Sequence, residues 1–328
     1  MARILMSMAE SAVMLLVWLL LLLLFGLFSE NFLSAATFRT LANSIPTLTV
    51  VATGMTLVLL IGGIDLSVGS VLGFCGSVLG LAMVNWHWSF PAAGLLCAGA
   101  GLLAGWLNGV ISVHFAIPSF IVTLGMLEVA RGLAYLSTHS QTQYIGSRVE
   151  ALAANLALGI SPAFMLSVLV VIAAQIVLSK TLFGRLLVAI GTNEQAVRLA
   201  GINPRPAKVA AFCILGFLTG VGALFYTSRL GSADPNAGAG LELSAIAAVV
   251  IGGTSLLGGR GSVINSFFGV LIIATLQAGL AQVGATEPIK RVVTGGVIIG
   301  AVMLDAWRHR LTRTKLGRFG RLFARSRT

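Results

Sequence analysis

The sequence predicts an all-α fold, a polytopic transmembrane helical bundle of about ten spans with the N- and C-termini in the cytoplasm. Of the 328 residues, 57% are hydrophobic and 9% are charged, whereas a soluble globular chain carries about 25% charged residues. Several long stretches hold no charged residue, and the longest covers residues 66–127. A transmembrane helix needs about 20 mostly apolar residues, so this stretch has room for two or three crossings.

Polar residues, prolines and glycines delimit the spans along the chain. A leucine-rich run forms the first span, Gly62 and Gly63 separate the second from the third, Pro118 opens the fifth, and Lys180 closes the sixth. The ten predicted spans are residues 11–28, 45–62, 66–84, 90–112, 117–137, 162–179, 209–229, 241–257, 262–283 and 288–305. Together they form one transmembrane domain, residues 1–305, with a long inner loop at 180–208 and a basic tail at 306–328.

The distribution of basic residues predicts the orientation. With the N-terminus inside, the cytoplasmic segments hold fifteen Lys and Arg residues and the outer segments hold five. Cytoplasmic loops of membrane proteins are enriched in Lys and Arg. The bias therefore favours an even number of spans and a cytoplasmic position for both ends.

The net charge of +11 does not predict a nucleic-acid partner. Eight of the basic residues lie between 306 and 328, which leaves a net charge of +3 for the rest. A basic cluster directly after an apolar segment is typical of a flank that lies on anionic lipid. We therefore expect the lipid bilayer, and no nucleic acid, to contact this tail.

Other classes of site are missing from the sequence. No glycine-rich loop ends in Gly-Lys-Ser or Gly-Lys-Thr, so the chain has no P-loop for a nucleotide. No His or Cys spacing predicts a metal site, and the three cysteines lie in apolar runs as packing residues. Inside the membrane, Glu128 and Arg131 are three residues apart and are expected to neutralise each other. A proton-driven carrier needs a longer chain of ionisable groups, so we expect energy to come from a partner.

Glycines at four-residue spacing predict close contacts between helices. Such pairs include Gly101 with Gly105, Gly216 with Gly220, and Gly296 with Gly300. Small residues at this spacing let helix backbones approach closely in lipid. A short internal echo also relates residues 61–70 to residues 251–262, as in transporters with repeated halves.

A carboxylate lies between two apolar spans in residues 62–70, Gly-Gly-Ile-Asp-Leu-Ser-Val-Gly-Ser. An Asp at membrane depth is costly unless it caps a helix or faces a polar cavity. Asp65 can cap the span that begins at Leu66, or it can contact the transported molecule together with Ser67. Both readings stay open at this point.

The inner loop at 180–208 contains a short amphipathic helix at 193–202. Asn193 is the expected N-cap, Glu194 lies at the positive helix end, and Gly201 is the expected stop. An apolar face formed by Ala196, Leu199 and Ala200 can lie on lipid or dock into a groove of another protein.

The third segment of interest is residues 117–125. Pro118 can open a helix at its first turn, which places Ser119 and Thr123 on one face beside Phe120. Hydroxyls and an aromatic ring suit a neutral polyol, although such hydroxyls also commonly bond back to their own helix.

Four motifs in order resemble the ribose-type branch of bacterial ABC-transporter permeases. They are GGIDLSVGS at 62–70, IPSFIVTLGMLEVARGLAY at 117–135, FGRLLVAIGTNEQAVRLAGI at 183–202 and LELSAIAAVVIGGTSLLGGRGS at 241–262. The resemblance covers nearly the whole chain. One departure is Asn43-Ser44-Ile45-Pro46, where a proline replaces the expected helix-friendly stretch and obscures the start of the second span.

The resemblance implies a transport subunit of the bacterial inner membrane that is not itself an enzyme. It implies a second permease copy or a related permease, a cytoplasmic ABC ATPase that uses ATP and Mg²⁺, and a periplasmic sugar-binding protein. The cargo is expected to be a monosaccharide such as ribose or a related sugar, translocated by alternating access. This chain itself is expected to bind no cofactor.

The resemblance also assigns roles to two sets of residues. The expected contacts with the ATPase are Thr192, Asn193, Glu194, Ala196, Leu199 and Gly201. The expected translocation pathway comprises Asp65, Ser67, Ser119, Phe120, Thr123 and Glu242.

Two other classes remain as alternatives. A secondary, ion-coupled sugar carrier would need no ATPase, and the shortage of intramembrane ionisable groups argues against it. A channel would need a polar ring along a pore, and the sequence offers none.

Overall fold

The computed structural model describes residues 2–154, 156, 159–300 and 302–303, which form an α-helical bundle. Its first half contains α1 (Ala2–Phe28), α2 (Ala35–Ser44), α3 (Pro46–Leu60), α4 (Val68–Val84), α5 (Phe90–His114) and α6 (Ser119–Thr138). Its second half contains α7 (Pro162–Lys180), α8 (Leu182–Leu199), α9 (Arg205–Leu230), α10 (Leu241–Ile251) and α11 (Val263–Gln282), and residues 287–300 are helical too. A 3₁₀ helix, η1 (Gly146–Leu152), and an antiparallel pair of two-residue strands, β1 (Gln143–Tyr144) and β2 (Ser232–Ala233), complete it.

Local capping explains where several helices begin. The Oγ of Ser34 accepts from the Thr37 amide at the start of α2, and Ser161 caps α7 through the Phe164 amide in the same way. Pro46 opens α3, directly after the end of α2, and the two helices meet at a bend of 49°. The unexpected proline is therefore the joint between two helices, because a proline fits the first turn of a helix but not its interior.

The prediction of ten spans is confirmed only in part. A helix lies in each predicted segment, but among the described residues six helices are long and apolar enough to cross a membrane, and the bent pair α2–α3 makes a seventh. The apolar helices α4 and α10 are shorter, with 17 and 11 residues. At 1.5 Å per residue, α10 reaches about 16 Å, roughly half of a hydrocarbon core.

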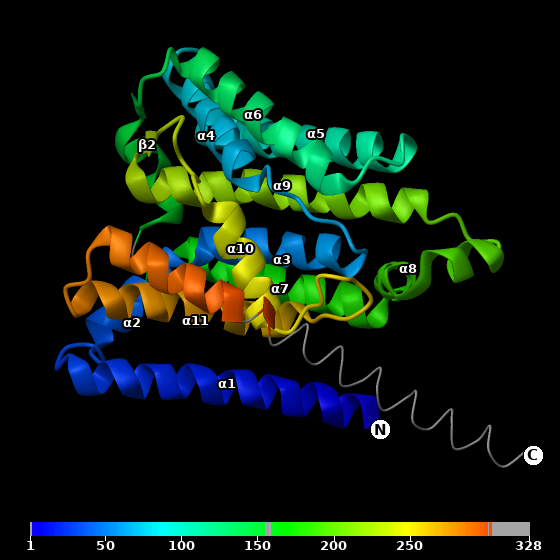
Figure 1. Cartoon of the computed structure of the whole chain (residues 1–328). Helices are drawn as coiled ribbons and strands as arrows, with labels where there is room; N and C mark the ends of the chain where they lie inside the picture. Colours follow the sequence, from blue (N-terminus) through cyan, green and yellow to red (C-terminus); the bar gives the residue numbers. More distant parts are fainter. Residues whose placement is uncertain (1, 155, 157–158, 301, 304–328) are drawn as a thin grey trace, which may run out of the picture.

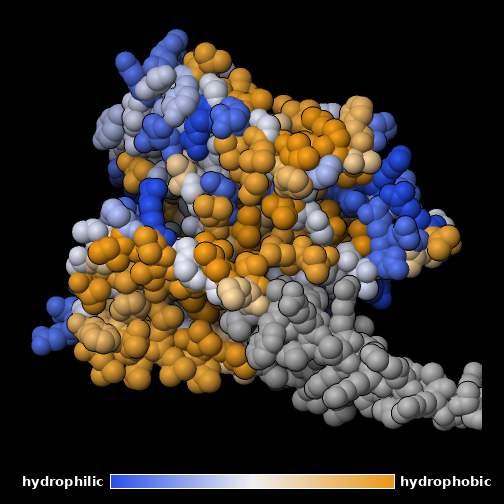
Figure 2. All heavy atoms as spheres, in the orientation of Figure 1, coloured by the Kyte–Doolittle hydropathy of each residue, from blue (hydrophilic) through white to orange (hydrophobic). Residues whose placement is uncertain are grey.

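Figure 1 shows helices that run nearly parallel between two ends of the bundle. The N-terminal end of α1 and helix α8 lie at one end, while α2 and β2 lie at the other. Hydrophilic side chains gather near these two ends, and a hydrophobic surface covers the region between them (Figure 2). The α1 N-terminus and the 180–208 segment thus lie on one side, as the charge bias predicts. The predicted tail at 306–328 lies outside the described residues.

Two long helices, α5 and α9, cross at a seam of glycines. A Cβ at Gly105 would lie 3.0 Å from the Cα of Gly216, and a Cβ at Gly220 would lie 2.8 Å from the Cα of Ala98. The predicted close approach is confirmed for these glycines, because only the missing side chain lets the backbones come so near. It is not confirmed for Gly296 and Gly300, since nothing within 4 Å would meet a Cβ there.

Candidate functional site

Between α3 and α4 the chain leaves helical geometry for residues 61–67. Gly62 turns the chain with a φ of +73°, a value that only glycine adopts readily. The two amides that follow are held by α6: the Ile64 N–H donates to the Ser119 Oγ at 2.9 Å, and the Leu66 N–H to the Thr123 Oγ1 at 3.1 Å. Irregular backbone at membrane depth requires such partners. The hydroxyls of Ser119 and Thr123 therefore hold this break in place.

Asp65 is buried at the centre of the break, with 2% of its surface exposed. Its Oδ1 accepts from the Ser67 amide at 2.8 Å and from the Ser67 hydroxyl at 2.6 Å, and its Oδ2 accepts from the Asn108 amide group at 3.2 Å. Helix α4 begins at Val68, with Ser67 at the N-cap position. Asp65 therefore stabilises the turn before α4 through Ser67. It is not the N-cap residue itself, because it lies two residues before that position.

A second break lies between α10 and α11, at residues 252–262. Gly253 has a φ of +83°, Thr254 and Ser255 are fully buried, and the amide of Gly259 donates to the carbonyl of Leu60 at 2.8 Å. Leu60 is the last residue of α3. The second break therefore bonds to the end of α3, directly before the first break, and discontinuous helices of this kind form the substrate sites of many transporters.

Helix α8 lies close against the second break and against the end of α3, next to the first break. A Cβ at Gly191 would overlap the carbonyl oxygen of Leu60 and the amide nitrogen of Gly259, and a Cβ at Gly259 would lie 2.9 Å from the amide nitrogen of Thr192. Thr192 also bonds back to its own helix through the Val188 carbonyl at 2.7 Å. No side chain separates these three segments, so displacement of α8 at Gly191 must displace the breaks or part from them.

The predicted short helix is present as the last part of α8. Asn193 departs from helical geometry (φ −161°, ψ 96°) and accepts from the Ala196 amide at 3.0 Å, which is the expected N-cap. Gly201 ends the segment with a φ of +79°. On this helix Val197 is buried while the Leu199 side chain is 90% exposed. The segment 180–208 is therefore mostly helical instead of a loop, and the apolar face predicted for docking is uncovered.

Glu194 ties the short helix to α9. Its carboxylate accepts from Arg198 at 2.5 Å, one turn along, and from Lys208 at 3.0 Å on α9. Partial burial opposes ionisation, but the hydrogen bonds and charges of Arg198 and Lys208 outweigh it and lower the pKa of Glu194. The residue that was expected to contact an ATPase is thus engaged within the chain, where it fixes the angle of the short helix.

A cavity of about 360 Å³ joins the two sets of predicted residues. Gly62 and Gly63 of the first break and Ser119 of α6 line one part of it, and Glu194 and Lys208 line another. The segment predicted to contact an ATPase and the predicted translocation pathway therefore border a common cavity at the α8 end of the bundle.

The remaining predicted pathway residues lie farther apart. Phe120 is 45% exposed on the outer face of α6. Glu242, in the first turn of α10, lies against the bare backbone of Gly69 in the first turn of α4. A carboxylate is favoured at helix N-termini, so Glu242 stabilises the starts of two helices.

The expected neutralisation of Glu128 by Arg131 is wrong. The Arg131 guanidinium donates to the carbonyls of Pro235 and Ala237, at 3.1 Å for Ala237. No ion pair between Arg131 and Glu128 occurs in the described part of the chain. The loop before α10 supplies backbone acceptors that the helical spacing could not reveal.

Asn108 is the site residue that sequence reasoning missed. Its amide nitrogen reaches both the Asp65 carboxylate and the Ser67 hydroxyl, the latter at 3.0 Å, and the residue is buried. The available signal was a carboxamide in an otherwise apolar span, residues 90–112. Such a group has to find a partner inside the membrane.

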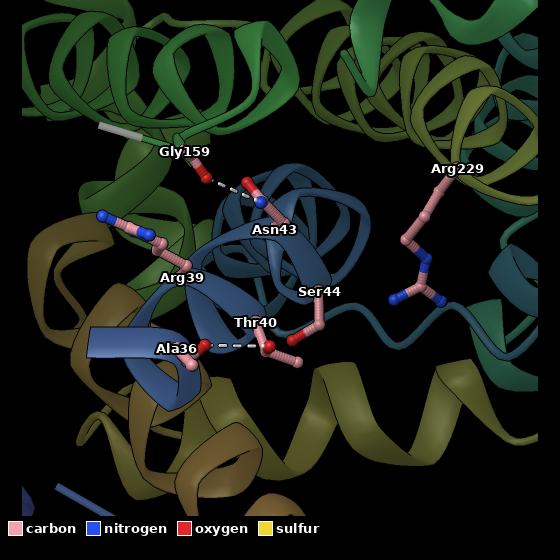
Figure 3. A pocket seen from close by; sticks show the side chains of 7 residues that line it. All are labelled: Ala36, Arg39, Thr40, Asn43, Ser44, Gly159 and Arg229. Carbon is pink, nitrogen blue, oxygen red and sulfur yellow. Dashed lines mark hydrogen bonds between the residues drawn. The ribbon is translucent and has the colours of Figure 1, made fainter. Parts of the chain in front are cut away.

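A pocket of about 470 Å³ opens at the other end of the bundle, where α2 and α9 come together (Figure 3). Its basic residues are Arg39 and Arg229, and the Asn43 amide spans to the carbonyl of Gly159 at 3.0 Å. Both arginines belong to the outer set in the charge count, so their position at the end opposite α8 agrees with that assignment.

The fold and the site define a class of protein. A helical membrane bundle with two neighbouring glycine breaks, and a short exposed helix next to them, is typical of a transport subunit. The comparisons with known proteins specify this class further.

A family described as "Branched-chain amino acid transport system / permease component" matches residues 37–302. The chain is 33% identical to the autoinducer 2 import system permease protein LsrC of Photorhabdus luminescens over 288 residues, 87% of each chain. It is also 33% identical to the protein of that name from Escherichia coli (strain K12 / DH10B), covering 92% of this chain and 89% of the relative. No solved structure matches the chain.

The chain belongs to this permease family, because the match spans most of its length. The predicted membership of the bacterial ABC-importer permeases is confirmed, and the chain is a multi-pass protein of the bacterial inner membrane.

Proposed function

We propose that this chain is the translocation subunit of an ATP-driven importer for a small hydroxyl-rich molecule, a monosaccharide such as ribose or a related sugar. A cytoplasmic ATPase, which uses ATP and Mg²⁺, docks on the short helix of α8. A periplasmic binding protein delivers the cargo, and a second permease copy or a related permease completes the pathway.

The contact of α8 with the second break and with the end of α3 carries this proposal. The backbone of Gly191 and Thr192 lies against Leu60 and Gly259, immediately before a helix whose Leu199 stands free of the bundle. A partner that binds Leu199 can therefore displace the breaks, because no flexible side chain lies between the backbone of Gly191 and that of Leu60 and Gly259. Coupling requires that this binding differ between the two states of the transporter, since equal contact in both would shift nothing.

The breaks can respond to such a movement because their hydrogen bonds are few and identifiable. Ser119 and Thr123 each hold one amide of the first break, and the Gly259 amide joins the second break to α3. Exchange of these few bonds separates an inward-open from an outward-open arrangement. Alternating access then follows from rearrangement at the breaks while the glycine seam of α5 and α9 stays closed.

The cargo assignment rests on chemistry and on the relatives. The groups near the breaks are hydroxyls, amides and carboxylates, which suit the hydroxyls of a neutral polyol. The similar LsrC proteins are named for autoinducer 2 import, and the matching family is described for branched-chain amino acids. Ribose, autoinducer 2 and leucine are therefore the three probes to compare.

Reconstituted transport tests the proposal. The chain is purified with its cognate ATPase and binding protein and placed in proteoliposomes. ATP-dependent accumulation of ribose or autoinducer 2 is the expected result. Accumulation of leucine alone would contradict the cargo class, and uptake that needs no ATPase would favour the ion-coupled carrier.

Substitution on α8 tests the coupling role separately. Leu199→Asp is expected to weaken ATPase binding and uptake while the membrane domain remains folded, because the side chain is 90% exposed. Leu182→Asp is the matched control: Leu182 is 77% exposed on the same helix, but it lies in the first turn, where an acid is favoured. Equal effects of the two changes would show that the short helix is not part of the docking surface.

A further inference from the structure

Glu128 lies at the middle of a transmembrane helix and points away from its own bundle. It is the tenth of the 20 residues of α6, and its side chain is exposed. Within the described residues, no hydrogen bond or ion pair reaches its carboxylate. The proposed transport function gives no role to this residue.

The nearest cation along the helix is already engaged. Arg131 follows three residues later, and its guanidinium is held by the backbone carbonyls of Pro235 and Ala237. Glu128 also lacks the compensation that Glu242 has, since a mid-helix position is far from the positive end of α6. Its charge is therefore uncompensated within the part of the chain that the structure describes.

The helix surface beside Glu128 is bare. Gly125 and Gly132 lie three residues before it and four after it, hence on the same face. A Cβ at either glycine would meet nothing within 4 Å. The carboxylate thus stands clear of neighbouring side chains, with room for a ligand on both sides along the helix.

Hydrocarbon is a poor environment for this face. Ionisable residues inside membranes almost always face a bundle interior or a water-filled cavity, and they mark pathways for substrates. Glu128 does not face the interior of this bundle, which leaves water as its surroundings in the assembled transporter. Helix α6 is also linked to the first break, because Ser119 and Thr123 hold the break and lie less than three turns before Glu128.

We propose that Glu128 lines the aqueous translocation pathway and accepts hydrogen bonds from hydroxyl groups of the cargo. A carboxylate has about four acceptor positions and no donor when ionised, and its hydrogen bonds are roughly twice as strong as neutral ones. It favours a neutral polyol and repels an anionic cargo. The proposal deepens the proposed function and rests on it for the identity of the cargo.

Cysteine accessibility tests the location without any knowledge of the cargo. Glu128→Cys is compared with Leu20→Cys, an exposed position near the middle of the apolar span of α1, in the full importer carrying Cys213→Ala. A charged methanethiosulfonate is expected to modify Glu128→Cys at least about tenfold faster, since the reactive thiolate forms in water and not in hydrocarbon. Equal rates would overturn the proposal.

Gly125→Cys provides a second measurement on the same face if Glu128→Cys fails to assemble. It introduces a thiol into open space and removes no charge. It is expected to react as fast as Glu128→Cys. Protection at both positions, in both nucleotide states, would instead show that a second permease copy covers this face tightly, which contradicts the aqueous pathway.

Uptake measurements test the contact with cargo. Glu128→Leu is expected to lower ribose uptake roughly tenfold or more, as loss of a charge-assisted hydrogen bond implies. Glu128→Gln keeps an acceptor oxygen and is expected to retain intermediate uptake with a raised KM. Wild-type uptake by Glu128→Leu would overturn the contact. If the wild-type importer moves no sugar, the proposed function fails, whereas the labelling result still decides the location.

Discussion

Helices α1 and α6 are both poorly covered by the rest of the chain, yet α6 adds an acidic side chain, Glu128, to an otherwise apolar exposed surface. In their most apolar windows only 11% of α1 and 17% of α6 is buried. The exposed face of α1 is leucine, as at Leu16, Leu20 and Leu24, whereas α6 exposes Glu128. The apolar exposed face of α1 suits lipid, whereas the proposed pathway role of Glu128 requires that its part of α6 contact water.

The polar contacts of α1 and α6 show the same difference between the two helices. Within residues 11–28 of α1, two polar side chains face α11: Ser11 bonds to Asn265 at 2.6 Å and Trp18 to Thr275 at 2.9 Å. Helix α6 uses polar groups near both ends, with Thr123 on the first break and Tyr135 on Asn236 at 2.7 Å. Only α6 has charged side chains in between. Arg131 bonds inward to the loop before α10, but within the described residues no such bond reaches Glu128.

The strongest test of the comparison moves the charge to α1. Leu20→Glu is expected to reduce membrane insertion, because an acid at the centre of a lipid-facing helix costs about 3 kcal/mol. Glu128→Leu is expected to insert as well as the wild type. The inserted fraction is measured after expression, with Leu20→Gln as the uncharged control. Equal insertion of Leu20→Glu and wild type would remove the contrast between the helices.

A smaller effect is expected within α5, which has both an open and a packed face. Gly105→Ala is expected to destabilise the fold by about 1 to 3 kcal/mol, because the added methyl meets the backbone of α9 and neither helix can yield easily. Gly99→Ala on the same helix meets nothing within 4 Å. Thermal unfolding in detergent distinguishes them, and equal midpoints would show that the seam is not tight.

The two carboxylates Asp65 and Glu128 differ in burial, because Asp65 is buried and the Glu128 side chain is exposed. Asn108→Leu leaves the Oδ2 of Asp65 without its donor, and loss of a hydrogen bond to a charged group is expected to cost about 1.5 kcal/mol. Glu128→Gln is expected to leave the unfolding midpoint unchanged, since no described residue contacts that carboxylate. A loss of stability in Glu128→Gln instead would indicate an internal partner.

The smallest effect concerns Glu194, a carboxylate that is paired at the surface. Arg198 and Lys208 lower its pKa below the ordinary value of 4.5, so its contribution is present above pH 4.5 and is lost as the pH falls through the lowered value. The contribution is expected to be less than about 1 kcal/mol because the pair is partly exposed. Glu194→Gln should therefore unfold slightly earlier than wild type at pH 7, and the difference should vanish as the pH falls below the lowered pKa of Glu194.

The sequence predicted the helical segments well because span length and helix ends depend on neighbouring residues. Asn193 and Gly201 bound the short helix of α8 as expected, since capping and a positive φ are local properties. The span count was less accurate. Hydropathy alone could not show that α10 ends after 11 residues, because Leu256 and Leu257 extended the predicted span past the glycines at 252 and 253.

The sequence identified several polar residues of the candidate site but not the hydrogen bonds that join them. Asp65, Ser119 and Thr123 were chosen for their polarity, and the structure joins them through the backbone of residues 64–66. The supposed pairing of Glu128 with Arg131 followed helical spacing, and the loop at 235–237 overrode it. A polar side chain bonds to whichever partner the fold brings near, and spacing along one helix does not determine that.

By itself the sequence determined the solvent of this protein and the places where its helices break, because these follow from local polarity and backbone freedom. Only the tertiary structure decided that the second break bonds to Leu60, next to the first break, that Asn108 supports Asp65, and that no hydrogen bond or ion pair within the described residues reaches the carboxylate of Glu128. These contacts join residues that are far apart in the chain. They depend on how closely glycine-bearing helices can pack, which no single segment specifies.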